Sequence, residues 1–350
     1  MDPIKSDMGK TLNSDTRRWV VFRLGHLGDV VLTTGVLSAL GNRRNWSFAF
    51  ITKSSWAGVF DRHPYVHAVI PLDASQLTTR PYLALCRRLA NEYSGWGLLD
   101  LHGCIRSRML SLVWQGPVLR YPKLGMQRRL FLASHGRLSG GLLRATSVAQ
   151  RYYMAVDPSP PSAAELLPRV WLTDAEHVAA KARLQGIFTE PVAPVALHPF
   201  ATHALKAWPE SHWRKLVSLL NASGIPWIIV GKGRPLYPES NRDLSNRTSL
   251  RESCAIIAQS RVLISGDSGP MHLGDANGTP VIALFGPTTR EWGFFPAGPR
   301  DIVLESALGC RPCSLHGKKP CPNSGSCLAA IAPEDVFRAI EQTAKTMYPV

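Results

Sequence analysis

The sequence has no long hydrophobic run and no feature of a secretion signal. None of its apolar stretches approaches the ~20 residues that a membrane-spanning helix needs. The first 18 residues are polar and mixed in charge, and they lack the apolar segment of a signal peptide. We therefore expect residues 1–18 to form a disordered leader, and we expect the protein to be cytoplasmic.

Two common nucleotide-binding signatures are also missing. Gly25 and Gly28 follow the first apolar segment without the Gly-x-Gly-x-x-Gly spacing of a dinucleotide site, and Gly231-Lys232-Gly233 lacks the third glycine as well. No Walker A sequence occurs anywhere in the chain. These absences argue against a dehydrogenase and against a P-loop NTPase.

Acidic residues are absent between positions 101 and 156, although the whole chain has 25 of them against 40 basic residues, a formal net charge of +15. Nine basic residues stand in this basic zone: Arg106, Arg108, Arg120, Lys123, Arg128, Arg129, Arg137, Arg144 and Arg151. Such a zone attracts a nucleic acid, an anionic membrane surface or a phosphorylated acceptor, or it is simply a surface that aids solubility. No nucleic-acid-binding signature accompanies it, so nucleic acid is the least favoured partner.

What the sequence does contain is an alternation of short apolar segments and helical patterns, typical of doubly wound α/β folds. Its 350 residues suit two domains, and the proline-rich run Pro158–Ser162 predicts the linker between them. Strands are predicted at 19–24, 47–51, 66–70, 97–101, 192–197, 225–230, 262–264 and 281–285. Helices are predicted at 30–40, 54–62, 81–93, 174–185, 211–220, 250–258, 270–277 and 333–346.

The stretch Arg261–Thr288 places small residues at the end of a buried strand and the start of a helix. N–H groups at a helix N-terminus can hold an anion, and glycine lets a backbone approach closely. In open α/β sheets ligands bind at this edge, so the stretch predicts a phosphate-sized site. Local chemistry alone also allows Asp267 and Ser268 to be helix caps and His272 to be an ordinary helix residue.

Two charged residues elsewhere stand where a reaction can use them. Asp29 follows a glycine-containing turn at a strand end, where it is either a helix cap or a general base for an attacking hydroxyl. Lys206 precedes a helix that Pro209 and Glu210 open, so its ammonium can meet a diphosphate.

Three motifs together resemble the glycosyltransferase family 9 heptosyltransferases, which transfer heptose from an ADP-sugar to the lipopolysaccharide inner core. They are Arg23-Leu24-Gly25-x-x-Gly28-Asp29; Lys206-Ala207-Trp208-Pro209; and Gly266-Asp267-Ser268-Gly269-Pro270-Met271-His272 with Gly278-Thr279-Pro280-Val281 and Phe285-Gly286-Pro287-Thr288. A weaker match, Asp100-Leu101-His102-Gly103 with Arg106, has His102 where the family more often has glutamine. Two departures are Phe200-Ala201, where the family often carries glycine or hydroxyl residues, and Gly274-Asp275, which we expect to interrupt a helix.

The resemblance covers about residues 19–340 and implies the GT-B architecture, in which two Rossmann-like domains with parallel sheets face a central cleft. It implies an acceptor-binding domain over 19–157, a linker over 158–172 and a nucleotide-sugar-binding domain over 173–332. A C-terminal helix within 333–350 would return to the first domain.

The resemblance also implies an inverting transferase with Asp29 as general base and Lys206 stabilising the departing ADP. The donor-binding residues would be Gly28, Thr202, Leu250, Asp267, Ser268, Gly269 and His272. The acceptor-binding residues would be His102, Arg106, Arg128 and Arg129, although Arg106 is equally well explained as a surface arginine. No cofactor is expected for catalysis, because neither motif offers the carboxylate pair of a magnesium site.

The implied partners are ADP-heptose and an anionic glycolipid, lipid A–Kdo or its heptosylated form, at the inner face of the inner membrane. The protein would then be peripheral on that membrane. Two alternatives stay open: heptose transfer to a protein, as in the autotransporter heptosyltransferases, and a non-catalytic nucleotide-sugar-binding module. No oligomeric state follows from the sequence.

Four of the seven cysteines form the pattern Cys310-x-x-Cys313-x7-Cys321-x5-Cys327. This spacing suits a structural zinc or iron site, which four thiolates would close to substrate, while disulfides are less favoured in a reducing compartment. Related autotransporter heptosyltransferases hold iron in a similar segment. The other three, Cys86, Cys104 and Cys254, are expected to be buried thiols.

Overall fold

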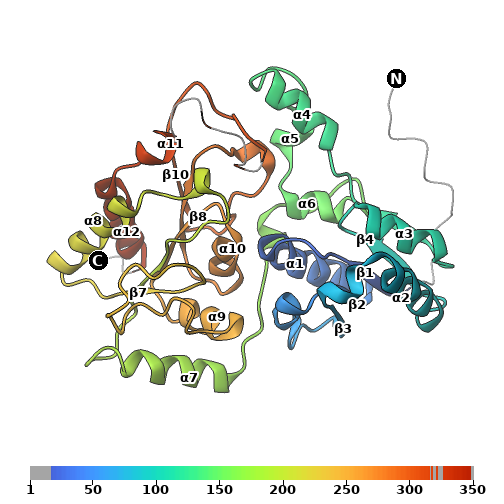
Figure 1. Ribbon diagram of the computed structural model, residues 1–350, viewed down its shortest axis with the longest axis horizontal. Coiled ribbons are helices and arrows are strands. Elements are labelled where there is room, and N and C mark those ends of the chain that lie inside the picture. Colours follow the sequence, from blue (N-terminus) through green and yellow to red (C-terminus); the bar gives the residue numbers. More distant parts are fainter. Residues whose placement is uncertain (1–16, 316, 318–320, 322–325, 348–350) are drawn as a thin grey trace.

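Two parallel five-stranded sheets, one in each half of the chain, form the frame of the molecule (Figure 1). The computed structural model describes residues 17–315, 317, 321 and 326–347. The predicted leader lies outside these residues apart from its last two, and Arg18 already belongs to the first strand. The alternation of strands and helices confirms the predicted α/β class.

The first sheet has the strand order β3-β2-β1-β4-β5. Its strands are β1 (Arg18–Phe22), β2 (Ser47–Lys53), β3 (Val66–Leu72), β4 (Gly97–Asp100) and β5 (Val118–Arg120). The helices of this half are α1 (Leu27–Arg44), α2 (Thr79–Glu92), α3 (Ile105–Val113), α4 (Gly125–Ala133), α5 (Gly141–Ala145) and α6 (Val148–Tyr153), with 3-10 turns η1 (Ser54–Phe60), η2 (Ala74–Leu77) and η3 (Ala164–Leu166). Val20 and Val21 of the central strand enter two different apolar clusters, because both faces of a parallel sheet are covered.

The second sheet has the strand order β10-β9-β8-β6-β7. Its strands are β6 (Val195–His198), β7 (Trp227–Ile229), β8 (Val262–Gly266), β9 (Val281–Phe285) and β10 (Ile302–Glu305). The helices of this half are α7 (Asp174–Gln185), α8 (Glu210–Ala222), α9 (Leu250–Ala258), α10 (Gly269–Ala276), α11 (Ser326–Ala329) and α12 (Pro333–Met347), with η4 (Ala204–Lys206) and η5 (Arg290–Trp292). None of the described helices of either half is both long and apolar enough to cross a membrane.

The C-terminal helix α12 does not return to the first half, which corrects the expectation from the sequence. It packs on α8 and β9 of the second half. Its apolar residues Val336, Ala339 and Ile340 recur at helical spacing and join the core on that face of the sheet. The apolar stripe of α12 is therefore already covered within the second half.

The linker and α10 also differ from the simplest expectation. The linker is packed on α1: the N–H of Arg169 donates to the Thr34 hydroxyl at 2.9 Å, and Leu166 is buried. Gly274 does not interrupt α10, which continues to Ala276. A Cβ on Gly274 would lie 2.4 Å from Cγ2 of Val281, so the close packing of this helix on β9 requires glycine.

The two halves of the chain meet through α1 and α10. A Cβ on Gly269 would lie 2.8 Å from the Cβ of Leu27 and 3.0 Å from the nitrogen of Gly28. One apolar cluster continues across the contact, from Val31 of α1 to Leu273 of α10. The contact therefore brings the N-terminal ends of both helices to the same place.

Candidate active site

The predicted functional residues follow strands at the two places where the strand order reverses. In the first sheet Asp29 follows β1, and Asp100 ends the neighbouring strand β4. In the second sheet Lys206 follows β6 and Asp267 follows the neighbouring strand β8. Connections leave such a strand pair in opposite directions, so a crevice opens at the carboxyl ends where ligands bind. The topology thus places both sets of residues at a ligand-binding edge.

Asp29 is held by two side chains rather than used as a helix cap, since the N-cap of α1 is His26. Nη2 of Arg23 lies 2.6 Å from Oδ2 of Asp29, and the Tyr152 hydroxyl donates to Oδ1 at 2.9 Å. Burial alone would raise the pKa of Asp29, but the charge of Arg23 and the two hydrogen bonds outweigh it and hold this pKa below its usual value. The carboxylate is therefore ionised and fixed in orientation.

Arg128 of α4 lies near the same carboxylate. Burial lowers the pKa of this guanidinium, and the nearby negative charge of Asp29 opposes the effect. Its Nη2 donates to the carbonyl of Trp292 at 3.4 Å, while its Nε is buried without a hydrogen-bond partner among the described residues. Because an unpaired buried N–H is costly, this position favours an incoming anionic oxygen.

At the second sheet, Lys206 is paired with Asp267. The lysine Nζ lies 2.5 Å from Oδ2 of Asp267, and the Thr288 hydroxyl donates to the same oxygen at 2.6 Å. A Cβ on Gly317 would lie 3.0 Å from Cγ of Lys206, so part of the cysteine-rich segment covers the lysine. A diphosphate carries more negative charge than one carboxylate, so it can replace Asp267 as the partner of this ammonium.

The N-terminus of α10 begins beside this pair. Its N-cap Ser268 makes no side-chain cap hydrogen bond, and the Ser268 hydroxyl lies instead 3.1 Å from that of Ser265. The first-turn N–H groups of α10, beginning at Gly269, are therefore not capped by this hydroxyl and point toward the helix end where an anion binds.

His272, on the next turn of α10, lies where the two halves of the chain meet. A Cβ on Gly28 would lie 2.7 Å from Cδ2 of the His272 ring, so the imidazole rests against the start of α1. Burial lowers the pKa of His272 to about 4, against the opposing charges of Asp267 and Asp29. A neutral imidazole therefore stands near the carboxylates of both halves, and its Nδ1 is buried without a partner in the described part of the chain.

Two of the predicted acceptor residues make local contacts. Nδ1 of His102 accepts the N–H of Leu24 at 3.2 Å, and burial lowers the pKa of His102 to about 4. Arg106 donates to the carbonyl of Leu77 from Nε and Nη2, at 3.3 and 3.1 Å. These contacts fix the loop after β4 and the start of α3, and they engage part of each side chain.

Among the described residues, no hydrogen bond links the remaining predicted residues to Asp29, Lys206, Asp267 or His272. Arg129 and Thr202 are exposed. Leu250 begins α9 and packs, half-buried, against the large apolar cluster of the protein. Its side chain offers a ligand only van der Waals contact.

Arg151 corrects the interpretation of the basic zone as a uniform surface. It is completely buried. Its guanidinium donates to five acceptors: the carbonyls of Leu143, Thr146, Glu291 and Trp292 and the hydroxyl of Thr146. Because residues 291 and 292 belong to the second half, Arg151 joins the two halves instead of facing a partner.

Sequence reasoning also missed the roles of several polar side chains around the site. Arg23 and Thr288 lie within the recognised motifs, so their positions were available, whereas nothing near Tyr152 in the sequence points to Asp29. Arg311 is a third case: it donates to the carbonyls of Gly286 and Thr288 at 2.6 and 3.0 Å. It also donates to the Ser306 carbonyl and the Glu305 carboxylate, and thereby fixes the loop that carries Thr288.

The four clustered cysteines are free thiols, and they lie close enough to interact electrostatically. Burial raises the pKa of Cys313, and the negative charges of Cys310, Cys327 and Cys321 raise it further. In the described part of the chain, however, no group of three or more His, Cys, Asp or Glu side chains could hold a metal ion. The described residues therefore give no support to the predicted zinc or iron site, which stays a prediction. The other thiols are buried at 86 and 254 and half-buried at 104.

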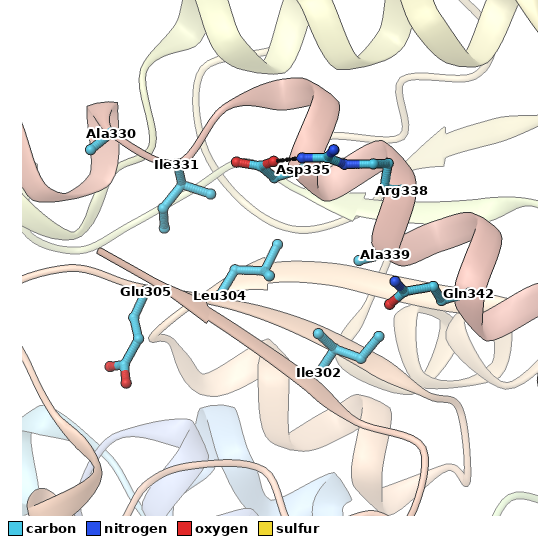
Figure 2. Close-up of a pocket in the computed structure, with 9 residues that line it drawn as sticks. All are labelled: Ile302, Leu304, Glu305, Ala330, Ile331, Asp335, Arg338, Ala339 and Gln342. Carbon is cyan, nitrogen blue, oxygen red and sulfur yellow. Dashed lines mark hydrogen bonds and ion pairs between the residues drawn. The ribbon is translucent and has the colours of Figure 1, made fainter. Parts of the chain in front are cut away.

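A surface pocket of about 360 Å³ lies elsewhere, between β10 and α12 (Figure 2). Ile302 and Leu304 of the strand face Ala339 and Gln342 of the helix. The Arg338 guanidinium in its wall is already paired with Asp335. This pocket contains none of the predicted site residues, and the arginine among its lining residues is already paired, so it offers no free cation for a phosphate.

Comparisons with known proteins agree with one another. The sequence model described as glycosyltransferase family 9 (heptosyltransferase) matches residues 162–323. Lipopolysaccharide heptosyltransferase 1 of Pseudomonas aeruginosa is 26% identical over 329 residues, which cover 87% of each chain.

Two solved structures share the fold. A family 9 glycosyltransferase from Veillonella parvula has a TM-score of 0.73 at 18% identity, over 95% of this chain and 98% of that one. An Escherichia coli heptosyltransferase with ADP-2-deoxy-2-fluoro heptose has a TM-score of 0.60 at 20% identity, over 93% and 99%. These likenesses confirm the predicted architecture of two Rossmann-like domains.

Proposed function

Because the chain belongs to glycosyltransferase family 9, the heptosyltransferase family, we propose that it transfers heptose from ADP-heptose to the lipopolysaccharide inner core. The names of its relatives support heptose transfer in lipopolysaccharide biosynthesis. One observation carries the proposal for the site: buried His272 lies near Asp29 of the first half of the chain and near the Lys206–Asp267 pair of the second half. A base and a phosphate-binding cation thus belong to one centre.

Asp29 is the general base of the proposed reaction. The acceptor hydroxyl gives its proton to the Asp29 carboxylate while its oxygen attacks the anomeric carbon of heptose. The bond from that carbon to ADP breaks on the opposite face, so the configuration inverts. Arg23 and Tyr152 keep the carboxylate ionised and oriented, and a positioned base contributes about 10²–10⁴-fold to rate.

Lys206 and the N-terminus of α10 stabilise the charge that grows on ADP. When the diphosphate arrives, the ammonium of Lys206 leaves Asp267 for the phosphate oxygens, and the N–H groups near Ser268 and Gly269 donate to them. Asp267 and His272 then orient the donor. We assign the rest of the donor site to Gly28, Thr202 and Leu250.

The acceptor in this proposal is an anionic glycolipid, lipid A–Kdo or heptosyl-Kdo, at the inner face of the inner membrane. Arg128 is the main support, because its buried Nε lacks a partner among the described residues and lies near the base. His102, Arg106 and Arg129 complete the proposed acceptor side, which lies in the domain proposed over 19–157. The donor side lies in the domain proposed over 173–332.

In the proposed reaction, all protein groups that act on the substrates are side chains or N–H groups named above. The candidate metal ligands Cys310, Cys313, Cys321 and Cys327 take no part in any of its steps. The cysteine-rich segment contributes instead through Gly317 and Arg311, which contact Lys206 and the loop carrying Thr288.

A transfer assay with three acceptors tests the proposal. ADP-heptose is incubated with lipid A–Kdo, with its heptosylated form and with an autotransporter protein, and Asp29→Asn is the control for catalysis. Heptose on a glycolipid is the expected result. Transfer to the protein alone would replace the acceptor, and ADP binding without any transfer would leave only a binding module. Thermal shifts with ADP, UDP and GDP identify the nucleotide, because a ligand of the folded state raises the melting temperature.

A further inference from the structure

The outer face of α4 carries large apolar side chains that nothing in the described structure covers. Met126 and Leu130 are 70% and 46% exposed. Together with exposed Arg129 and Ala133 they occupy positions i, i+3, i+4 and i+7, so the four side chains form one stripe. We refer to these four residues as the α4 stripe.

The inner face of the same helix is already covered by apolar side chains of the protein. Phe131 is buried and packs with Leu124, Leu143 and Trp292 in a small apolar cluster. The helix is therefore anchored by its inner face, and the α4 stripe is not needed for folding of this region. Figure 1 shows α4 at the upper edge of the molecule, projecting from the body that the two sheets form.

Exposed apolar side chains are concentrated in this part of the molecule. Of nine large hydrophobic residues exposed in the described structure, six lie between positions 105 and 138: Ile105, Leu112, Val113, Met126, Leu130 and Leu138. The same region has no acidic residue, and Arg129 of the stripe and Arg137, which follows α4, are exposed. Apolar side chains flanked by arginine are the features by which a surface helix enters an anionic lipid interface.

We propose that the α4 stripe docks this protein on an anionic lipid bilayer, with Met126 and Leu130 entering the interface and Arg129 and Arg137 meeting lipid phosphates. A second copy of the chain is a poorer occupant, because a symmetric contact would place arginines against arginines. The purpose of this docking rests on the proposed function, because a glycolipid acceptor lies in such a bilayer. Arg128, whose Nε lacks a partner among the described residues, is on the same helix and would face that acceptor.

Vesicle co-sedimentation of the full chain tests the docking surface. Vesicles of phosphatidylethanolamine and phosphatidylglycerol, free of lipopolysaccharide, are compared with neutral phosphatidylcholine vesicles. We expect binding to the anionic vesicles and about tenfold weaker binding of the Met126→Ser/Leu130→Ser variant. Arg137→Gln is expected to weaken binding about threefold and to reduce its dependence on salt.

Val178→Ser is the matched control, because Val178 is 67% exposed on α7, a helix of the other half. It is expected to bind vesicles as the unmodified chain does. Absence of vesicle binding, or equal binding by the double serine variant, would overturn the proposal. So would binding that free glycerol phosphate displaces, because the site would then recognise a headgroup rather than a surface.

The outcome is independent of catalysis, since neither donor nor acceptor is present in the vesicle experiment. Transfer to a water-soluble acceptor without acyl chains then separates the two proposals. The double serine variant is expected to keep this activity within about twofold, because neither residue belongs to the proposed catalytic site. Vesicle binding without any transfer would leave the docking surface standing and remove the proposed function.

Discussion

The two sides of the proposed active site are built on the same plan and held in different ways. Each presents a charged group neutralised by a partner: Asp29 with Arg23 in the first half, and Lys206 with Asp267 in the second. Asp29, the proposed base, is held by Arg23, which directly follows β1, and by Tyr152 of α6, and its helix packs directly on α10. The lysine instead stands in a 3-10 turn, with a loop residue, Gly317, against its side chain.

This difference suggests that the Asp29 side of the site is rigid and the Lys206 side is mobile. In the proposed reaction the base must be oriented before the acceptor arrives, and Arg23 and Tyr152 engage both oxygens of the Asp29 carboxylate. In the same proposal Lys206 must exchange Asp267 for a diphosphate that binds and leaves in each cycle, and a 3-10 turn and a loop residue allow it to move. We therefore expect substitutions near Asp29 to change turnover and its pH dependence, and substitutions near Lys206 to change nucleotide affinity.

The largest expected effects are those of replacing Asp29 and Lys206, and they should differ in nucleotide binding. Asp29→Asn should lower kcat by about 10²–10⁴-fold, because it removes the base, and should leave the Kd for ADP unchanged. Lys206→Met should lower kcat by a similar factor and also weaken ADP binding about tenfold or more, because it removes a charge from the leaving group. Calorimetric titration with ADP checks the split. Weakened ADP binding in Asp29→Asn would contradict the assignment of this residue to the acceptor side.

The next effect concerns how the base is held. The Tyr152 hydroxyl helps to keep the pKa of Asp29 low, so Tyr152→Phe should raise that pKa. Because the base acts only when ionised, the acidic limb of kcat/KM should move to higher pH, by about one pH unit. Tyr153→Phe, the next residue of α6, is the matched control and should leave the profile in place. An unshifted profile in Tyr152→Phe would show that Asp29 does not set this limb.

Local sequence predicted well those elements whose ends carry their own signals. Helices α7 and α9 have the predicted bounds. Each begins with a capping box, Thr173 with Glu176 and Ser249 with Glu252, which satisfies the first N–H groups. Strands β2, β3, β8 and β9 begin at the predicted residues, because apolar runs bounded by glycine, proline or polar residues mark buried parallel strands.

The elements that the sequence did not reveal depend on contacts between distant residues. Helices α3 to α6 lie in the basic zone, where apolar side chains also cover the outside and blur the helical period. The partners of Asp29 show the same limit: Tyr152 lies 123 residues away in sequence and is brought to the carboxylate by packing of α6 on α1. The placement of α12 likewise follows from which sheet face needs cover, a property of the assembled fold.

A smaller effect is expected at the loop behind Lys206. Arg311 holds the carbonyls of Gly286 and Thr288, and the Thr288 hydroxyl holds Asp267. Arg311→Ala should therefore loosen the loop and weaken ADP binding about threefold to tenfold, with kcat at saturation reduced less. Arg338→Ala, which removes an exposed ion pair of α12, is the control and should change neither quantity. Unchanged ADP affinity in Arg311→Ala would show that the loop does not position the lysine.

The smallest effect tests whether α10 is held as rigidly as the side of the proposed site that carries Asp29. Burial raises the pKa of Asp275 on this helix to about 9, and neighbouring Asp301 adds to the rise. A folded-state pKa above the unfolded one means that the stability contributed by the protonated group is complete below pH 4 and is lost as pH rises through about 9. Asp275→Asn cannot ionise, so it should melt about 2–4 °C higher than the unmodified chain at pH 8 and show a flatter pH dependence. Asp61→Asn, on an exposed side chain, controls for the loss of one negative charge. Asp275 lies beyond the N-terminal turn of α10, so the affinity for ADP should stay unchanged in Asp275→Asn. A lower affinity would show that α10 responds to the nucleotide as the loops do, and it would contradict the proposed division between a rigid side and a mobile side.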